Sequence, residues 1–464
     1  MASPTRRRRL VAPLLGVAAG TVLFAGSAAA HGGSLGAAAR ESLAVPTWLF
    51  LLTGGAAVGA SFLLASFVTD RTFLRRLHAW QVPVTVPGRA VMVPLARLAG
   101  VSALLAVIGF GLLGPPAPLA NLGVLLVWVA WWAGFTATTY LVGNAWPLVD
   151  PWRTIAGALP ALDRGYPDRL AAWSGVAGLL ALVWLEVVSP LADAPRLLAA
   201  VVVGYTALTL AGATALGSDR WFGTVDPIAR VFRYYGHVAP LTRDADAGGL
   251  RLRVPGSGLV GGDVVTDFDE AAFVVAVLWV TTYDGLVATP AWADVARALV
   301  GAGVPAPLLY PAALLGGFAL FLAAYRLAAR ASRRTADTYR TGRSLAVSFA
   351  PSLVPIAAGY HLAHYAEYVL ALLPAVLAAL ASPLAPAAAV PVAQVPAWFG
   401  GVSLACVLLG HLLGIWVAHA TAYDMFPGRL QAVRSQYPLV LVMVCYTATS
   451  LWIVSQPTVQ PPFL

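Results

Sequence analysis

The chain has 464 residues, of which 59% are hydrophobic and 11% are charged, and its mean hydropathy is +0.78. A water-soluble fold of this length needs a polar surface over its core, whereas a chain surrounded by lipid stays apolar both inside and outside. The net charge of +9 comes from arginine, since the sequence contains no lysine, and the arginines lie in short segments between apolar runs. We therefore predict an all-α, polytopic integral membrane protein that contacts membrane lipid and has no nucleic-acid partner.

Residues 1–30 have the pattern of a cleaved signal peptide. Residues 6–9 are arginines, residues 10–24 are apolar, and three alanines at 28–30 provide a small-residue cleavage site. The mature chain would then begin at His31. An amino-terminal histidine can chelate copper with its own amine and imidazole, and chance placement is the alternative.

Ten apolar runs follow, each near the roughly 20 residues that cross a bilayer as a helix. In chain order the predicted spans are Val45 to Val68, Leu98 to Leu113, Leu122 to Val142, Leu170 to Val188, Leu197 to Leu216, Ala271 to Leu286, Leu308 to Tyr325, Leu345 to Leu380, Ala397 to Ala420 and Leu439 to Val454. Arginine is concentrated in alternate connections, as it is in cytoplasmic loops. We predict about ten transmembrane helices with both mature termini outside, in a multi-pass protein of the plasma membrane. Residues 31–464 would form one transmembrane domain with a longer cytoplasmic loop at 217–270.

The eighth run is too long for one perpendicular helix and contains Pro351, Pro355 and Pro374. Proline removes a backbone donor and bends a helix. We therefore predict that this span is broken or kinked. Such breaks at membrane depth are frequent sites of function.

Two cytoplasmic loops share a short pattern that ends in aspartate and proline. Trp146-Pro-Leu-Val-Asp150-Pro follows the third run, and Phe222-Gly-Thr-Val-Asp226-Pro follows the fifth. Aspartate before proline is a favourable helix start, because the acid caps the helix and proline fits its first turn. The second copy continues as an amphipathic stretch to His237, which we place at the lipid headgroup boundary. We favour two loop anchors on a duplicated helical hairpin, with a substrate gate as the alternative.

Four of the seven histidines fall in the eighth and ninth runs. His361 and His364 are three residues apart on one helix face, with Glu367 one turn further, and His411 and His419 follow in the next run. Because the two helices run antiparallel, His411 is predicted at the depth of the first pair. His419 would lie about 12 Å further inward. Imidazole is a common ligand of copper, zinc and iron, so these four histidines are the candidate metal site, with copper favoured and haem or zinc as alternatives. Hydrogen bonding between helices or a proton relay would place histidines in the same way.

Two cysteines and two acidic residues within the apolar runs are further candidates for a functional role. Cys406 and Cys445 indicate no disulfide framework; we interpret them as small buried hydrophobes, and as thiolates they would favour copper. Glu186 and Asp284 could lie on an ion path, cap a helix end or pair with arginine.

Four segments of the chain carry a resemblance to a known family. They are Ala357-Ala-Gly-Tyr-His361-Leu-Ala-His-Tyr365, Gly410-His411 through His419, Gln436-Tyr-Pro-Leu-Val-Leu-Val-Met443 through Trp452, and Asn144 through Thr154 in the first Asp-Pro loop. With these segments the chain resembles the actinobacterial multi-pass proteins named fenitrothion hydrolase-like. The family name implies hydrolysis of organophosphate esters, a reaction that metal-activated water can perform.

Three functions are therefore open at the level of sequence. The first is metal handling or redox chemistry, with copper or haem bound by the histidine cluster. The second is a membrane-bound hydrolase that acts on a small apolar substrate at the same site. The third is a proton-coupled transporter in which the histidines carry protons.

Overall fold

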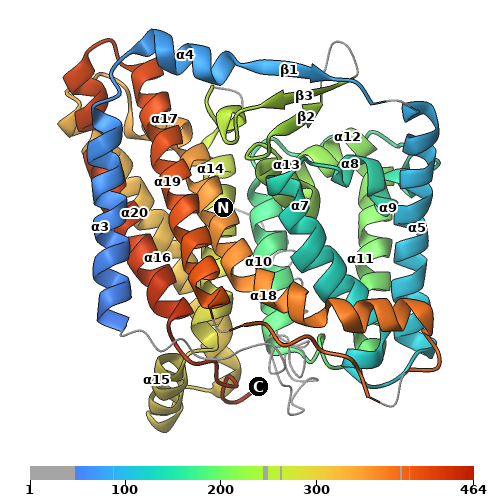
Figure 1. Ribbon diagram of the computed structural model, residues 1–464. Coiled ribbons are helices and arrows are strands. Elements are labelled where there is room, and N and C mark those ends of the chain that lie inside the picture. Colours follow the sequence, from blue (N-terminus) through green and yellow to red (C-terminus); the bar gives the residue numbers. More distant parts are fainter. Residues whose placement is uncertain (1–46, 87, 244–248, 262–263, 387–388, 397) are drawn as a thin grey trace, which may run out of the picture.

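The computed structural model describes residues 47–464, apart from 87, 244–248, 262–263, 387–388 and 397 (Figure 1). The predicted signal peptide and His31 lie outside these residues. The described chain is a bundle of long helices with a small sheet at one of its ends.

Eight helical segments of the described chain are long and apolar enough to cross a membrane. They are α5 (Arg89–Leu113), the continuous α6 (Leu122–Leu125), η2 (Leu126–Phe135) and α7 (Thr136–Leu141), α11 (Pro195–Leu216), α14 (Phe268–Val287), α16 (Ala306–Thr335), the continuous α17 (Gly342–Phe349), η5 (Ala350–Leu353) and α18 (Val354–Ala381), α19 (Phe399–Met425), and α20 (Arg429–Val454). A bent pair, α3 (Thr47–Ser66) and α4 (Arg71–Ala79), raises this number to nine if it is one span. α10 (Trp173–Val188) is apolar but has only 16 residues. Each predicted run, as far as it is described, thus contains a helix, but eight or nine helices of the described chain, and not ten, are long and apolar enough to span a membrane. The chain is a polytopic membrane protein.

The connections between spans contain short elements, including three strands that the sequence analysis did not predict. The short helical elements are η1 (Pro118–Ala120), α8 (Trp146–Val149), α9 (Pro151–Ala156), α12 (Ser218–Arg220), η3 (Trp221–Val225), α13 (Pro227–Gly236), η4 (Ser257–Leu259) and α15 (Pro290–Gly301). Strands β1 (Gln81–Val84), β2 (Leu241–Arg243) and β3 (Leu250–Arg253) form an antiparallel sheet in the order β1-β3-β2. The long loop predicted at 217–270 is therefore folded, and through β3 it pairs with the connection that follows α4.

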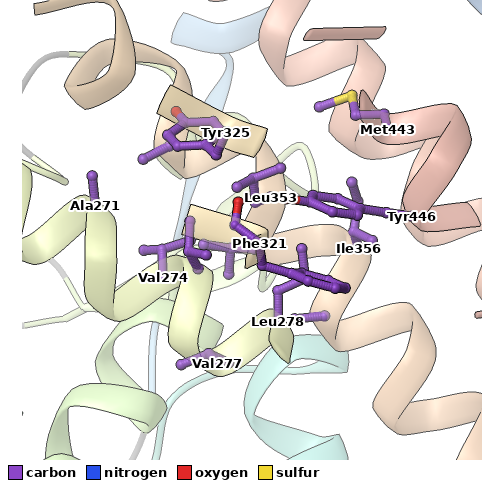
Figure 2. Close-up of a cluster of buried hydrophobic side chains, with 14 of the residues drawn as sticks. Ala271, Val274, Val277, Leu278, Phe321, Tyr325, Leu353, Ile356, Met443 and Tyr446 are labelled. Carbon is purple, nitrogen blue, oxygen red and sulfur yellow. Dashed lines mark hydrogen bonds between the residues drawn. The ribbon is translucent and has the colours of Figure 1, made fainter. Parts of the chain in front are cut away.

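α14 is the central helix of the larger part of the bundle. Its side chains are buried from Ala271 to Val280, and they pack against α16, η5, α18 and α20. Figure 2 shows Val274 and Leu278 beside Phe321 of α16 and Tyr446 of α20. The rings of Phe321 and Tyr446 stack with centroids 4.5 Å apart. A helix enclosed in this way presents any ionisable side chain to protein and not to lipid.

α18 and α19 cross at a seam of glycines. A Cβ atom on Gly359 would lie 2.6 Å from the carbonyl oxygen of Cys406 and 2.8 Å from the Cα of Gly410. A Cβ atom on Gly414 would lie 2.7 Å from the carbonyl oxygen of Ser352. Small residues allow membrane helices to approach to backbone contact. The seam therefore fixes which face of α18 meets α19.

Candidate functional site

The predicted break in the eighth span is confirmed. α17 ends at Phe349, a 3-10 turn runs from Ala350 to Leu353 and contains Pro351, and α18 begins at Val354. Proline lacks the N–H that would continue the helical hydrogen bonds, so the ladder is interrupted at this point. The histidines lie two to three turns beyond the break.

His364 faces an acidic residue of the central helix. Its Nε2 lies 3.3 Å from Oδ2 of Asp284, and the two side chains are only 13% and 15% exposed. The hydroxyl of Tyr365 donates to the same carboxylate oxygen at 3.3 Å. The Asp284 carboxyl also interacts electrostatically with Glu186 of α10. Three helices thus bring two carboxyls, an imidazole and a phenol together inside the bundle.

His361 belongs to an adjoining set of polar contacts. Its Nδ1 is 3.0 Å from the hydroxyl of Tyr140, and its ring centroid lies 4.7 Å from that of Tyr365. Trp132 of η2 donates from Nε1 to the Tyr365 hydroxyl at 3.1 Å. The ring centroid of Tyr235, on α13, lies 5.3 Å from that of Tyr140. The contacts therefore continue from Asp284 through Tyr365 to His361 and Tyr140.

These contacts form one polar network inside the bundle. It begins at Asp284 on the central helix. It ends at Tyr140, which lies one residue before the end of α7 and close to the small sheet, because the backbone of Gly143 bridges to Leu241.

His411 and His419 lie apart from this network. Nδ1 of His411 bonds to the carbonyl of Val407 at 2.9 Å, and the side chain is fully buried. His419 bonds through Nε2 to the carbonyl of Val68 at 3.0 Å, and the amide of Gln436 lies 3.4 Å from its Nδ1. His419 therefore joins α19 to α20 and to the segment after α3, which is the interhelical role that the sequence analysis held as an alternative.

The glycine seam explains why the histidines separate. His361 is two positions after Gly359, so it points about 200° around α18 from the residue that meets α19. Among the residues that the structure describes, no group of three or more His, Cys, Asp or Glu side chains could hold a metal ion. The shared metal site stays a prediction, while Nε2 of His361 and Nε2 of His411 are buried without a hydrogen-bond partner in the described chain. Cys406 and Cys445 are free thiols, but Cys406 is only partly buried and Cys445 is exposed, so the prediction that both are buried is wrong.

The two Asp-Pro loops form the predicted caps. Asp150 accepts a hydrogen bond from the N–H of Arg153 at 3.0 Å, and Asp226 accepts one from the N–H of Ile228 at 3.0 Å. Both carboxyls are buried, and the Tyr205 hydroxyl donates to Asp226 at 2.5 Å. Burial raises the pKa of Asp150 to about 7 and that of Asp226 to about 6. The two aspartates therefore cap their helices as predicted, but they do so as buried groups with raised pKa values.

α13 differs from the prediction of a helix at the headgroup boundary. Phe232, Tyr234 and Tyr235 are buried in the protein. Arg230 is buried as well and donates to Glu270 of α14 at 3.0 Å, next to a second bond from Arg233 at 2.8 Å. The helix is amphipathic as predicted, but its apolar face packs on protein instead of lipid.

Comparison with known proteins gives no match: no family model, no curated protein and no solved structure matches the chain. The resemblance to fenitrothion hydrolase-like proteins, and the hydrolase activity that it implies, stay predictions from the sequence.

The sequence analysis named His361, His364, Asp284 and Glu186 but did not predict that the last three lie together. It also missed the aromatic partners, of which Tyr140 is an example. A signal was present, because Tyr140 is a polar residue at the end of an apolar run. Its partner could not be identified without the packing of the helices.

Proposed function

We propose that this membrane protein is a proton-coupled transporter in which Asp284 and His364 bind and release the coupling proton. The observation that carries the proposal is the 3.3 Å contact between these two side chains on the central helix and the broken span. Ionisable residues inside membrane bundles are costly, and chains of Asp, Glu and His carry protons in pumps and transporters.

The chemistry of the pair suits proton exchange. A proton between Oδ2 of Asp284 and Nε2 of His364 can lie on either atom, and the net charge of the pair stays the same. Glu186 adds a second carboxyl that interacts with Asp284. Two ionised carboxyls in an apolar bundle repel each other, so binding of one proton lowers the energy of the pair.

The adjoining hydroxyl and imidazole groups support a proton route in two hydrogen-bonded parts, which are separated by the ring contact between Tyr365 and His361. Tyr365 contacts the Asp284 carboxylate, and the Tyr365 ring packs on His361, which bonds to Tyr140. A hydroxyl both donates and accepts, and a neutral imidazole does the same through its two nitrogens. The break at Pro351 lies two to three helical turns before the histidines, and it is the point at which we propose that this span bends in alternating access.

Infrared difference spectroscopy between acidic and alkaline buffer tests the proton site without knowledge of the substrate. Purified protein in lipid should show the carbonyl stretch of a protonated carboxyl that disappears on deprotonation. Buried Asp150 and Asp226, whose pKa values are about 7 and 6, would give a similar band, so the spectra compare variants made in an Asp150→Asn, Asp226→Asn parent. In this parent Asp284→Asn should remove the remaining band, and Glu186→Gln should shift or reduce it. The matched control is Asp294→Asn, on an exposed acid of α15. A remaining band of equal size with and without Asp284→Asn would refute the proposal.

Transport itself is tested in proteoliposomes that contain a pH-sensitive dye. A potassium diffusion potential should drive proton uptake above the level of protein-free vesicles when a candidate substrate is present. His364→Gln should abolish the uptake, because glutamine keeps a polar side chain but does not titrate. Uptake that survives in this variant would exclude His364 from the route.

Metal binding is the second candidate function, and one observation favours it. Nε2 of His361 and Nε2 of His411 are buried without a partner in the described chain, and a neutral imidazole in that state is able to bind copper or zinc. Metal analysis of the purified protein separates the candidates. Stoichiometric metal that is lost in both His361→Ala and His411→Ala would favour metal handling over proton transport.

A further inference from the structure

α4 leaves the bundle at an angle that differs from that of the spans. It is bent by 110° from the preceding helix and runs along the end of the bundle, followed by β1 (Figure 1). Asp70 caps it by accepting two backbone hydrogen bonds, at 2.8 and 3.1 Å. Arg71 donates to the carbonyls of Phe426 and Pro427, between α19 and α20. Protein contacts at the first turn therefore fix the direction of α4.

The helix presents different chemistry on its different sides. Leu74 is buried against the protein. Phe73 and Trp80 are 51% and 47% exposed, and since they are seven positions apart they lie on the same side, two turns from each other. Arg75 and Arg76 are exposed. A helix with exposed aromatic residues beside basic ones is typical of the membrane–water interface.

Helix α20 places a second arginine near α4. Arg429, the first residue of α20, is exposed, and the Asp70 carboxyl interacts electrostatically with both Arg76 and Arg429. Leu430, beside Arg429, is 68% exposed. The hydrogen bonds from Arg71 to Phe426 and Pro427 hold α4 beside the start of α20, so Arg76 and Arg429 lie on neighbouring helices, with apolar side chains next to each of them. The Asp70 carboxyl balances one of the two charges and leaves these three groups with a net charge of +1.

We infer that Arg76 and Arg429 bind the phosphate of an anionic phospholipid, whose chains lie along Phe73, Trp80 and Leu430. Arginine is suited to phosphate because its planar guanidinium donates two parallel hydrogen bonds. The exposed apolar side chains favour a lipid over free phosphate, since free phosphate gains nothing from them. This site is independent of the proposed proton pathway.

Native mass spectrometry of the purified full-length chain tests the inference, with phosphatidylglycerol, phosphatidylcholine and inorganic phosphate as the probes. Phosphatidylglycerol should bind more tightly than phosphatidylcholine. Arg76→Gln and Arg429→Gln should each weaken it about fivefold, the equivalent of about 1 kcal/mol for each basic residue near an anionic surface. Both side chains are exposed, so folding is not at risk. The matched control is Arg297→Gln, on exposed α15, which should bind as wild type does.

The variant Phe73→Ala distinguishes binding of a phospholipid from binding of free phosphate. It should weaken phosphatidylglycerol binding and leave any binding of inorganic phosphate unchanged. Equal binding of the two lipids, or an unchanged affinity in Arg76→Gln, would overturn the inference. Inorganic phosphate that displaces phosphatidylglycerol at equal concentration would also overturn it, because the site would then recognise phosphate alone.

Discussion

Replacement of Gly359 by alanine tests whether the glycine seam holds α18 in place. The added Cβ would lie 2.6 Å from the carbonyl oxygen of Cys406 and 2.8 Å from the Cα of Gly410. Both are backbone atoms of α19, so no side-chain rotation relieves the contact, and the two helices must separate. That movement would also displace His361 and His364.

The expected magnitude follows from two opposing terms. Overpacking of a filled interface costs about 1–3 kcal/mol. Alanine in place of glycine inside a helix recovers about 0.5–1 kcal/mol. We therefore expect Gly359→Ala to lower the free energy of unfolding by about 0–2.5 kcal/mol, and to be about 1–3 kcal/mol less stable than a variant that shows the helix gain alone. Gly316 of α16 is the matched control, because a Cβ atom added there would have no atom within 4 Å, and Gly316→Ala should show the helix gain alone.

The assay is unfolding of the detergent-solubilised protein by sodium dodecyl sulfate, followed by circular dichroism. The difference between the two variants isolates the contact term, since the substitution and the type of helix are the same. Equal unfolding free energies for Gly359→Ala and Gly316→Ala would refute the close contact as the reason for the seam.

Three further predictions concern buried polar groups. The pKa of Asp150 is raised to about 7, against an ordinary 3.8, so the folded protein holds this proton more tightly than the unfolded chain does. The protonated carboxyl therefore contributes fully to stability below about pH 4, and this contribution is lost as the pH rises through 7. Asp150→Asn keeps the helix cap and should make the melting temperature depend less on pH between these values. An unchanged pH dependence would contradict the raised pKa of Asp150. Glu270→Gln leaves Arg230, whose side chain is 2% exposed, without its counter-ion and should cost about 3 kcal/mol in the same unfolding assay, whereas neutralising an exposed ion pair on α15 should change little. Tyr140→Phe keeps the ring but removes the hydrogen bond to His361, and a loss of about 1–2 kcal/mol is expected; a variant as stable as wild type would show that this bond contributes nothing.

The fold was largely predictable from the sequence, because apolar length and proline placement are local properties. Each of the ten runs, as far as it is described, contains a helix, and the break at Pro351 followed from the chemistry of proline. The partners of the histidines were not predictable in the same way. Spacing shows that His361 and His364 share a helix face, but the side of α18 that meets α19 depends on the close approach at Gly359. The strands were missed because β1 pairs with a segment far away in the sequence.

The π-helical segment η2, residues Leu126–Phe135, carries Trp132 and directly precedes the turns that carry Tyr140. A π-helical turn holds one more residue than an α-helical turn, so it acts as an insertion that rotates everything after it. If the same residues were wound as an ordinary α-helix, the hydropathy of the span would be unchanged, yet Tyr140 would be rotated around the helix axis by about 100° for each π-helical turn that is lost. In this span the winding of the backbone, as much as the identity of the side chain, determines which partner the buried imidazole has.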